Sequence, residues 1–249
     1  MKDEEIDDVL EKAARAPHDL KPEMLQRVSD SIQDSILDLI KPSLRPVRPL
    51  PSTWVMTGGV VLACAAVSLS GAVRAGFFGF AKMDLLERSL IFPALVILAC
   101  VAGNEFVHAM IPGSLRRISP GGLLGFGSAA LLGVFALLFR DYRTDHFFSI
   151  GIVCLITGFL HAIPASLLSW LLLRRGFAVS SISAGLVAGM LGGLAGVGVL
   201  ELHCPNFQAT HVLVWHTAVV PLSGAAGALV AWMLRFFASS GARKRTIPE

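Results

Sequence analysis

Charged residues are scarce in this chain of 249 residues: 16% are Asp, Glu, Lys or Arg, whereas 54% are hydrophobic. A soluble domain usually carries about 25% charged residues, so the composition excludes an ordinary soluble enzyme and a disordered regulator. The charges are also clustered, which leaves several charge-free windows. Each window is long enough to cross a bilayer as a helix of about 20 residues. The sequence therefore predicts a polytopic membrane protein.

Cysteine is infrequent and shows no paired motif. The four cysteines lie at positions 64, 100, 154 and 204 without a C-x-x-C spacing, so spacing alone does not favour a structural zinc site. The chain does not begin with a basic segment followed by an apolar run, so we expect no cleavable signal peptide. G-x-S-x-G, H-E-x-x-H and Walker motifs are also missing. We therefore do not expect an enzyme, and we expect no bound cofactor.

An all-α bundle of six transmembrane helices is expected between residues 52 and 238. An even number of spans places both termini on one side of the membrane. Eleven basic residues flank the spans on that side and five on the other, so the positive-inside rule makes it the cytoplasmic side. A basic cytoplasmic tail follows at 239–249. The spans are predicted at 53–74, 89–111, 119–139, 147–173, 177–200 and 212–235.

Residues 1–51 form the predicted cytoplasmic N-terminal segment. Eleven acidic and five basic residues occur within 1–40, and apolar residues recur there at helical spacing. Two amphipathic helices are expected, one ending at Pro17 and one over 23–40. Two short helices cannot enclose a core, so their apolar stripes need each other, the membrane or a partner protein. The stripe of the second helix consists of Leu25, Val28, Ile32, Ile36 and Leu39.

A proline-rich linker connects this segment to the first span. Three prolines occur within six residues, together with Arg45 and Arg48, and this spacing favours an extended and stiff chain. The overall basic excess lies in the segments beside the membrane, so we expect no nucleic-acid partner.

Reactive side chains gather around the predicted turn after the fifth span. Imidazole, thiolate and carboxylate groups together suit a transition-metal ion, which could act as a signal; the alternative is a tight turn with interfacial polar groups. Cys154 lies about two turns inside the fourth span, in the same outer half of the membrane as Cys204. The two cysteines could meet only if the turn dips inward. The possible metal ligands are Glu201, His203, Cys204, His211 and His216.

Three polar residues fall inside predicted spans. Glu105 and His108 share one face of the second span, where an ionisable residue is a functional candidate, although Glu105 could also snorkel or pair with Arg116. His161 is expected to be a packed polar residue. For Cys64 and Cys100, in the middle of their spans, we expect the role of small hydrophobic residues.

A glycine repeat marks the fifth predicted span. Gly185, Gly189 and Gly193 recur at every fourth residue, which is typical of a face that packs closely against another helix. Homo-oligomerisation through this face is one interpretation.

Several of these pieces, taken in order, resemble the NrsF-type membrane proteins, negative regulators of sigma F. The first is the proline-rich linker, and the second is Cys154 with a Leu-Leu-Leu-Arg-Arg-Gly sequence at 171–176. The third is the Leu-His-Cys-Pro sequence at 202–205, and the last is the His-Val-Leu-Val-Trp-His sequence at 211–216. The likeness covers roughly 25–238, and the last two pieces are specific only in combination.

The resemblance implies a six-span anti-sigma factor in the inner membrane. Such a protein would hold an extracytoplasmic-function sigma factor and release it on envelope stress, with Cys154 and Cys204 as sensing candidates. Residues 1–22 extend beyond the family's usual short N-terminal segment, so 23–41 is the expected sigma-binding helix. Two other functions stay open. One is a small metal or solute permease that admits its substrate at the Cys/His turn, and the other is an interaction module that assembles through the glycine face.

Overall fold

The computed structural model describes residues 26, 27, 29–33, 51–111, 118–173 and 181–243, and every regular element among them is helical. The chain divides into two units, residues 1–50 and 51–249. In the described residues of the second unit, six helices are long and apolar enough to cross a membrane. This confirms the predicted all-α class.

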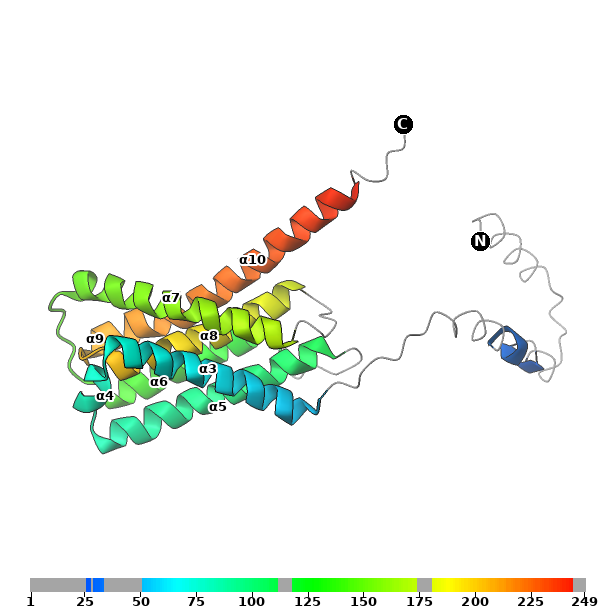
Figure 1. Ribbon diagram of the computed structural model, residues 1–249. Helices are drawn as coiled ribbons and strands as arrows, with labels where there is room; N and C mark the ends of the chain where they lie inside the picture. Colours follow the sequence, from blue (N-terminus) through cyan, green and yellow to red (C-terminus); the bar gives the residue numbers. More distant parts are fainter. Residues whose placement is uncertain (1–25, 28, 34–50, 112–117, 174–180, 244–249) are drawn as a thin grey trace. The chain divides into compact units, whose positions relative to one another are not determined.

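Five of the membrane-spanning helices are single elements, and the sixth is composite (Figure 1). A short helix, α4 (Phe78–Lys82), lies between the first two. The five are α3 (Thr53–Ala75), α5 (Leu85–Met110), α6 (Pro120–Leu138), α7 (Phe147–Leu173) and α8 (Ser181–His203). The sixth combines α9 (Ala209–His211), the π-helical turn η2 (Val212–His216) and α10 (Thr217–Arg243). Helix α10 therefore continues into the segment predicted as a basic tail.

Local capping explains where two of the spans begin. Asp84 and Glu87 form a reciprocal capping box, in which each side chain accepts a hydrogen bond from the backbone N–H of the other. Helix α5 consequently starts at Leu85, earlier than predicted from the apolar run. The Ser119 side chain accepts a hydrogen bond from the backbone N–H of Gly122, and a proline occupies the first position of α6.

Helix α8 is the central helix of the bundle. Every residue from Val187 to Glu201 is buried. A helix that is apolar and buried all round needs partners on all sides, and α8 contacts α3, α5, α7 and α10. It also extends to His203, so Glu201 and His203 belong to its last turn. The expectation that these two residues lie in the connecting loop was therefore wrong.

Glycines allow α8 to approach two neighbouring helices at backbone distance. A Cβ added at Gly185 or Gly189 would collide with the backbone of α10, at the carbonyl oxygens of residues 227 and 223. On another side of α8, a Cβ at Gly196 would collide with the carbonyl oxygen of Gly158 in α7. The glycine repeat is therefore a packing face, as small residues allow in membranes.

This packing corrects one prediction about the glycine repeat. Gly185, Gly189 and Gly193 pack on α10 of the same chain, and the Cα atom of Val220 in α10 lies 2.8 Å from the position of an added Gly193 Cβ. A second copy of the chain would have to displace α10 to reach this face. The repeat consequently does not offer the free oligomerisation surface that the spacing alone suggested.

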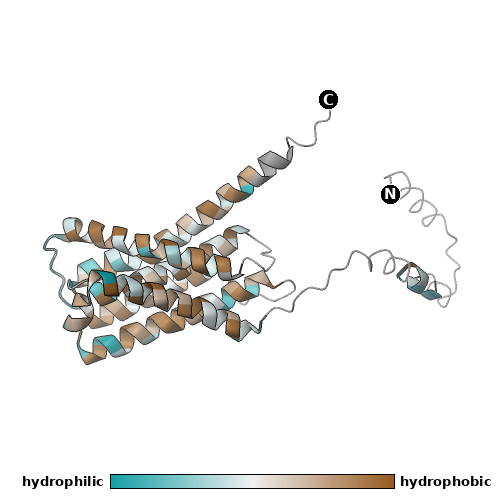
Figure 2. Cartoon of the chain, viewed as in Figure 1, coloured by the Kyte–Doolittle hydropathy of each residue, from teal (hydrophilic) through white to brown (hydrophobic). Residues whose placement is uncertain are grey.

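The outward surface of the bundle is apolar. Large hydrophobic side chains such as Leu62, Leu137 and Val153 are exposed on α3, α6 and α7. Figure 2 shows hydrophobic residues along the helices, while the connection between α6 and α7 is hydrophilic. An outer surface of this kind is what a bilayer solvates, and it agrees with the multi-pass membrane class.

Few residues of the N-terminal unit are described. Residues 26, 27 and 29–33 are helical and exposed, and Ile32 has 54% of its surface accessible. The remaining residues of the predicted stripe and the linker arginines lie outside the described residues; these are Leu25, Val28, Ile36, Leu39, Arg45 and Arg48.

The close contact between α8 and α10 predicts a site-specific loss of stability. Gly189→Ala places a methyl group against the α10 backbone, and overpacking of this kind costs about 1–3 kcal/mol. We expect a lower melting temperature of the detergent-solubilised protein by fluorescence-detected size-exclusion chromatography. Gly133→Ala in α6 is the matched control, because nothing lies within 4 Å of its added Cβ. Equal melting temperatures for the two variants would contradict this packing.

Candidate functional site

Four potential metal ligands meet at one end of the bundle. Cys154 of α7, Cys204, His211 of α9 and His216 of η2 each offer one ligand atom, and these atoms all lie within 4.8 Å of one another. We call these four residues the Cys/His centre. All four are buried, and both histidines have no accessible surface. The Sγ atoms of Cys154 and Cys204 are 3.5 Å apart, and Sγ of Cys204 lies 3.6 Å from Nε2 of His211.

The end of α8 supplies two of the polar groups. Glu201 and Cys204 are three residues apart, so helical geometry places them on the same side. The backbone N–H of Cys204 still donates to the Leu200 carbonyl oxygen at 2.7 Å, which continues the helical path to the cysteine. Glu201 is fully buried and accepts a hydrogen bond from Nδ1 of His216 at 2.6 Å. This pair ties the last turn of α8 to the sixth span.

The π-helical turn η2 brings the two histidines to one side of the sixth span. In an α-helix, residues five apart point about 140° away from each other around the axis. The hydrogen bonds of a π-helix run from residue i to i+5 and therefore place His216 nearly above His211. Their rings are 5.1 Å apart between centroids and meet edge to face.

A glycine in α7 brings Cys154 against this turn. A Cβ added at Gly151 would overlap the indole ring of Trp215, so the first turns of α7 approach η2 closely. Phe147 and Phe148 pack on the same indole, with ring centroids 5.3 and 6.1 Å from it. Because Cys154 lies about one turn beyond Gly151, this contact positions its thiol beside Cys204.

The connection between α6 and α7 braces the loop after Cys204. The backbone N–H of Ala209 donates to the Asp141 carbonyl oxygen at 2.7 Å, and the Thr210 hydroxyl donates to the Arg143 carbonyl oxygen at 2.6 Å. The Arg143 guanidinium hydrogen-bonds the Asp141 carboxylate, which lowers the pKa of that carboxyl. These contacts hold α9 over Cys204 and keep the centre buried.

His203 points away from the centre. Its Nδ1 lies 3.2 Å from the carbonyl oxygen of Gly76, and its ring packs against Phe78 of α4.

The structure therefore brings together three of the five predicted metal-ligand candidates, Cys204, His211 and His216, and places Glu201 behind His216. It adds Cys154, which the sequence suggested as a sensing candidate together with Cys204 but not among the five possible metal ligands. The spacing of the two histidines, five residues apart, was the available signal for the π-turn.

The two thiols of the centre are free and differ in environment. A hydrogen bond from the Cys154 thiol and another interaction with His211 lower the pKa of Cys204 and favour its thiolate. A thiolate beside a thiol can attack an oxidised sulfur to form a disulfide, and it is also the form that binds metals. The arrangement thus supports redox or metal chemistry.

The polar residues predicted inside the second and fourth spans lie elsewhere. Glu105 is buried on α5, and Arg116, its expected partner, lies outside the described residues. His108, about one turn further along α5, is half-buried. His161 packs against Gly71 of α3, and its Nδ1 lies 2.8 Å from the carbonyl oxygen four residues before it.

The two remaining cysteines also lie outside the centre. Cys64 is buried, and its thiol donates a hydrogen bond to the Leu191 carbonyl oxygen at 3.7 Å. Cys100 is exposed on the outward surface of α5.

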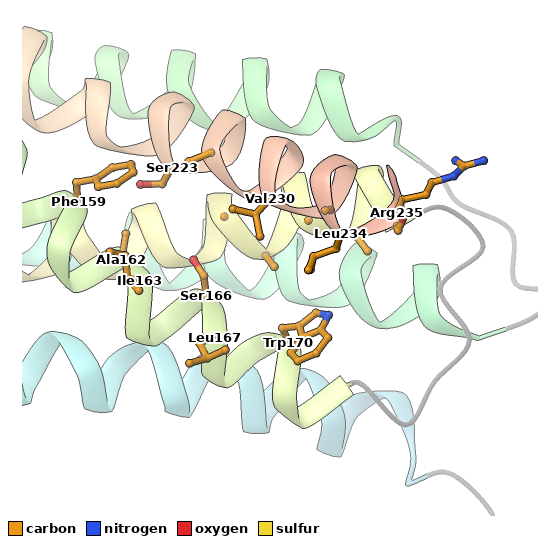
Figure 3. A pocket seen from close by; sticks show the side chains of 18 of the residues that line it. Phe159, Ala162, Ile163, Ser166, Leu167, Trp170, Ser223, Val230, Leu234 and Arg235 are labelled. Carbon is orange, nitrogen blue, oxygen red and sulfur yellow. The ribbon is translucent and has the colours of Figure 1, made fainter. Parts of the chain in front are cut away.

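A second feature is a cavity of about 690 Å³ between α7, α8 and α10 (Figure 3). Its lining includes Trp170, Leu234 and the hydroxyl groups of Ser166 and Ser223. Among its described lining residues only Arg235 is charged. The cavity offers apolar surface without a cluster of reactive groups, so the Cys/His centre is the better functional candidate.

The fold and the centre define a class: a six-span helical membrane protein with a buried cluster of thiols and imidazoles at one end. A family model described as NrsF, negative regulator of sigma F, matches residues 42–236. The chain belongs to this family and is accordingly a negative regulator of a sigma factor. No curated protein and no solved structure gave a significant match.

The short distance between the two sulfurs predicts selective disulfide formation. Treating the chelator-stripped, detergent-solubilised protein with diamide should remove two of its four free thiols and link Cys154 to Cys204. Peptide mass spectrometry after alkylation identifies the linked pair. Cys154→Ser should abolish this link, whereas Cys100→Ser should leave it intact. A dominant link that involves Cys64 or Cys100 would disprove the geometry.

Proposed function

We propose that this protein is a membrane-anchored anti-sigma factor of the bacterial inner membrane. Its N-terminal helices bind an extracytoplasmic-function sigma factor in the cytoplasm, and the Cys/His centre receives an envelope, redox or metal signal at the outer face. Family membership supplies the regulatory class. The observation that carries the sensing part is the buried juxtaposition of two free thiols with two imidazoles.

An exposed apolar residue on an acidic helix supports the binding role of the N-terminal segment. Ile32 lies in a helical segment, and more than half of its surface is accessible. Asp30, an acidic residue in the same segment, is exposed as well. Helices with an apolar stripe bind in grooves of partner proteins through residues spaced three and four apart. The acidic excess of 1–40 favours a basic partner surface, such as that of a protein that itself binds DNA.

The position of the centre supports a signalling role. It lies at the end of the bundle where α4 and α9 are found, whereas α3 begins at the opposite end (Figure 1). Under the positive-inside assignment, the centre faces the outside and the N-terminal segment the cytoplasm. A chemical change at the centre would act on α7, α8 and the sixth span together, because each contributes to it.

Signal transfer requires two arrangements of packed helices that differ in what they present to the sigma factor. The close glycine contacts of α8 with α7 and α10 favour a shift of whole helices over a local rearrangement. In the resting arrangement the sigma factor stays bound, and in the signalled arrangement the N-terminal helices release it.

The packing of the bundle argues against the permease alternative. A transported substrate must continue from the entry site through the bundle, but α8, the central helix beside the site, is buried at every residue from Val187 to Glu201. His203, an expected part of that entry site, instead contacts Gly76 and Phe78.

Truncation of the N-terminal segment tests sigma binding. Deleting residues 1–41 should leave a membrane-inserted protein that neither represses a sigma-dependent reporter nor co-purifies with the sigma factor. Deleting 1–22 should preserve both properties, because the second helix is retained. Ile32→Asp in the full chain should weaken co-purification at least about tenfold, since interface anchors contribute about 2 kcal/mol or more. Gln33→Ala on the same exposed segment is the matched control. Full repression by the 1–41 deletion would disprove this assignment.

Substitution of the thiols tests sensing separately. Cys154→Ser and Cys204→Ser should repress the reporter like the natural chain but respond at least about tenfold less to an oxidant or a thiol-binding metal added to cells. Cys100→Ser should respond normally, because Cys100 lies outside the centre. A normal response of both centre variants would rule out sensing by these cysteines.

A further inference from the structure

We propose that the Cys/His centre is a resident zinc site. The ligands would be Sγ of Cys154, Sγ of Cys204, Nε2 of His211 and Nε2 of His216, with Glu201 as the group that orients His216. This inference deepens the proposed function because it names the ion that the sensing residues bind. The role of that ion in signalling rests on the proposed function.

The spacing of the donor atoms matches the edges of a zinc tetrahedron. Zn–S bonds of about 2.3 Å and Zn–N bonds of about 2.05 Å give S–S edges of about 3.8 Å and S–N edges of about 3.6 Å. The Sγ atoms of Cys154 and Cys204 are 3.5 Å apart, and Sγ of Cys204 is 3.6 Å from Nε2 of His211. All remaining separations among the four donors are at most 4.8 Å. Small side-chain rotations would bring the four atoms around one ion.

The histidine nitrogens are oriented for ligation. Nδ1 of His216 is engaged by Glu201, which leaves Nε2 to face the centre, and this Nε2 has no hydrogen-bond partner among the described residues. His211 directs its Nε2 towards Cys204. Both rings are fully buried. An imidazole nitrogen without a partner at a buried site is costly, and a metal ion would satisfy it.

Glu201 completes the arrangement as an outer-shell group. Metal-ligating histidines commonly donate their other ring N–H to a carboxylate, which fixes the tautomer and strengthens the ligand. The hydrogen bond of 2.6 Å from His216 to the fully buried Glu201 has this geometry. A carboxylate in the interior of a membrane bundle otherwise costs several kcal/mol, so its burial there fits such a role.

The donor set selects the ion. Two thiolates and two imidazoles in a closed, tetrahedral arrangement suit Zn²⁺, and four protein ligands leave no position for a substrate. Binding forms two Zn–S and two Zn–N bonds, displaces the water ligands of the aqueous ion and releases any proton still held by a ligand atom, with no change of oxidation state. The ion would hold the two sulfurs as ligands, so that its loss would free both thiols to react.

Zinc content of the full-length, detergent-purified protein tests the site. After removal of adventitious metal by gel filtration, inductively coupled plasma mass spectrometry should find about one zinc ion per chain. Stripping with a chelator and adding Co²⁺ should produce the tetrahedral d–d bands and the thiolate-to-cobalt charge-transfer band. Glu201→Gln should keep the four ligands but weaken zinc affinity about 10–100-fold in competition with a chromophoric chelator.

Matched variants separate ligation from folding. Cys154→Ser, Cys204→Ser and His216→Ala should each bind zinc at least about tenfold more weakly, and the two serine variants should also weaken the charge-transfer band. Cys100→Ser and His203→Ala should retain one zinc ion, because neither residue belongs to the four donors. A measurement on the natural chain cannot be affected by misfolding of a variant. If this chain is stripped, reloaded with zinc and monodisperse, yet binds less than about a tenth of a zinc ion per chain, the proposal is wrong. Unchanged zinc affinity of Cys154→Ser and His216→Ala would overturn it as well.

The reporter assay keeps this inference distinct from the proposed function. A chain that holds zinc but fails to bind any sigma factor would refute the function and retain the site. A chain that represses and responds to its signal without ever binding zinc would refute the site and retain the function.

Discussion

The close contact of α8 with its neighbours is the constraint on which the rest of this structure depends. Glycines on one side of α8 approach the backbone of α10, and glycines on another side approach α7. Water does not drive helices together inside a bilayer, so association relies on close packing of this kind. The contact fixes the ends of three helices relative to each other, and the Cys/His centre forms where those ends meet.

Buried polarity at the end of α8 is the second constraint. Glu201 and His216 are both fully buried and share a short hydrogen bond, while Cys154, Cys204 and His211 surround the imidazole. Such a network stabilises one arrangement strongly when its members are satisfied, and it becomes costly when one member is altered. This sensitivity suits the cluster to sensing a chemical signal. A modification of a single sulfur changes the stability of the arrangement in which α7, α8 and the sixth span pack together.

Much of the fold could be predicted from the sequence, whereas the site was predictable only in part. All six spans were predicted because the bilayer imposes both length and apolarity; five of them coincide with charge-free windows, and the second is an apolar run that Glu105 interrupts. Boundaries were less predictable where local groups decide them, as at Asp84, whose capping box starts α5 before the most apolar residues.

In the site, Cys154 joins the other ligands through a tertiary contact between Gly151 and Trp215, which no local pattern reveals. The π-turn also aligns two histidines that α-helical periodicity would separate. Irregular backbone and long-range packing, rather than residue type, therefore determined which four residues form the Cys/His centre.

The orientation of the chain across the membrane tests the central claim most directly, since sensing outside and sigma binding inside both require it. An epitope tag placed before Met1 and a protease site inserted in the α6–α7 connection, between Tyr142 and Arg143, can be probed with protease added to intact spheroplasts. We expect the inserted site to be cut and the N-terminal tag to be protected until the membrane is permeabilised. Removal of the N-terminal tag from intact spheroplasts would contradict this orientation and the function built on it.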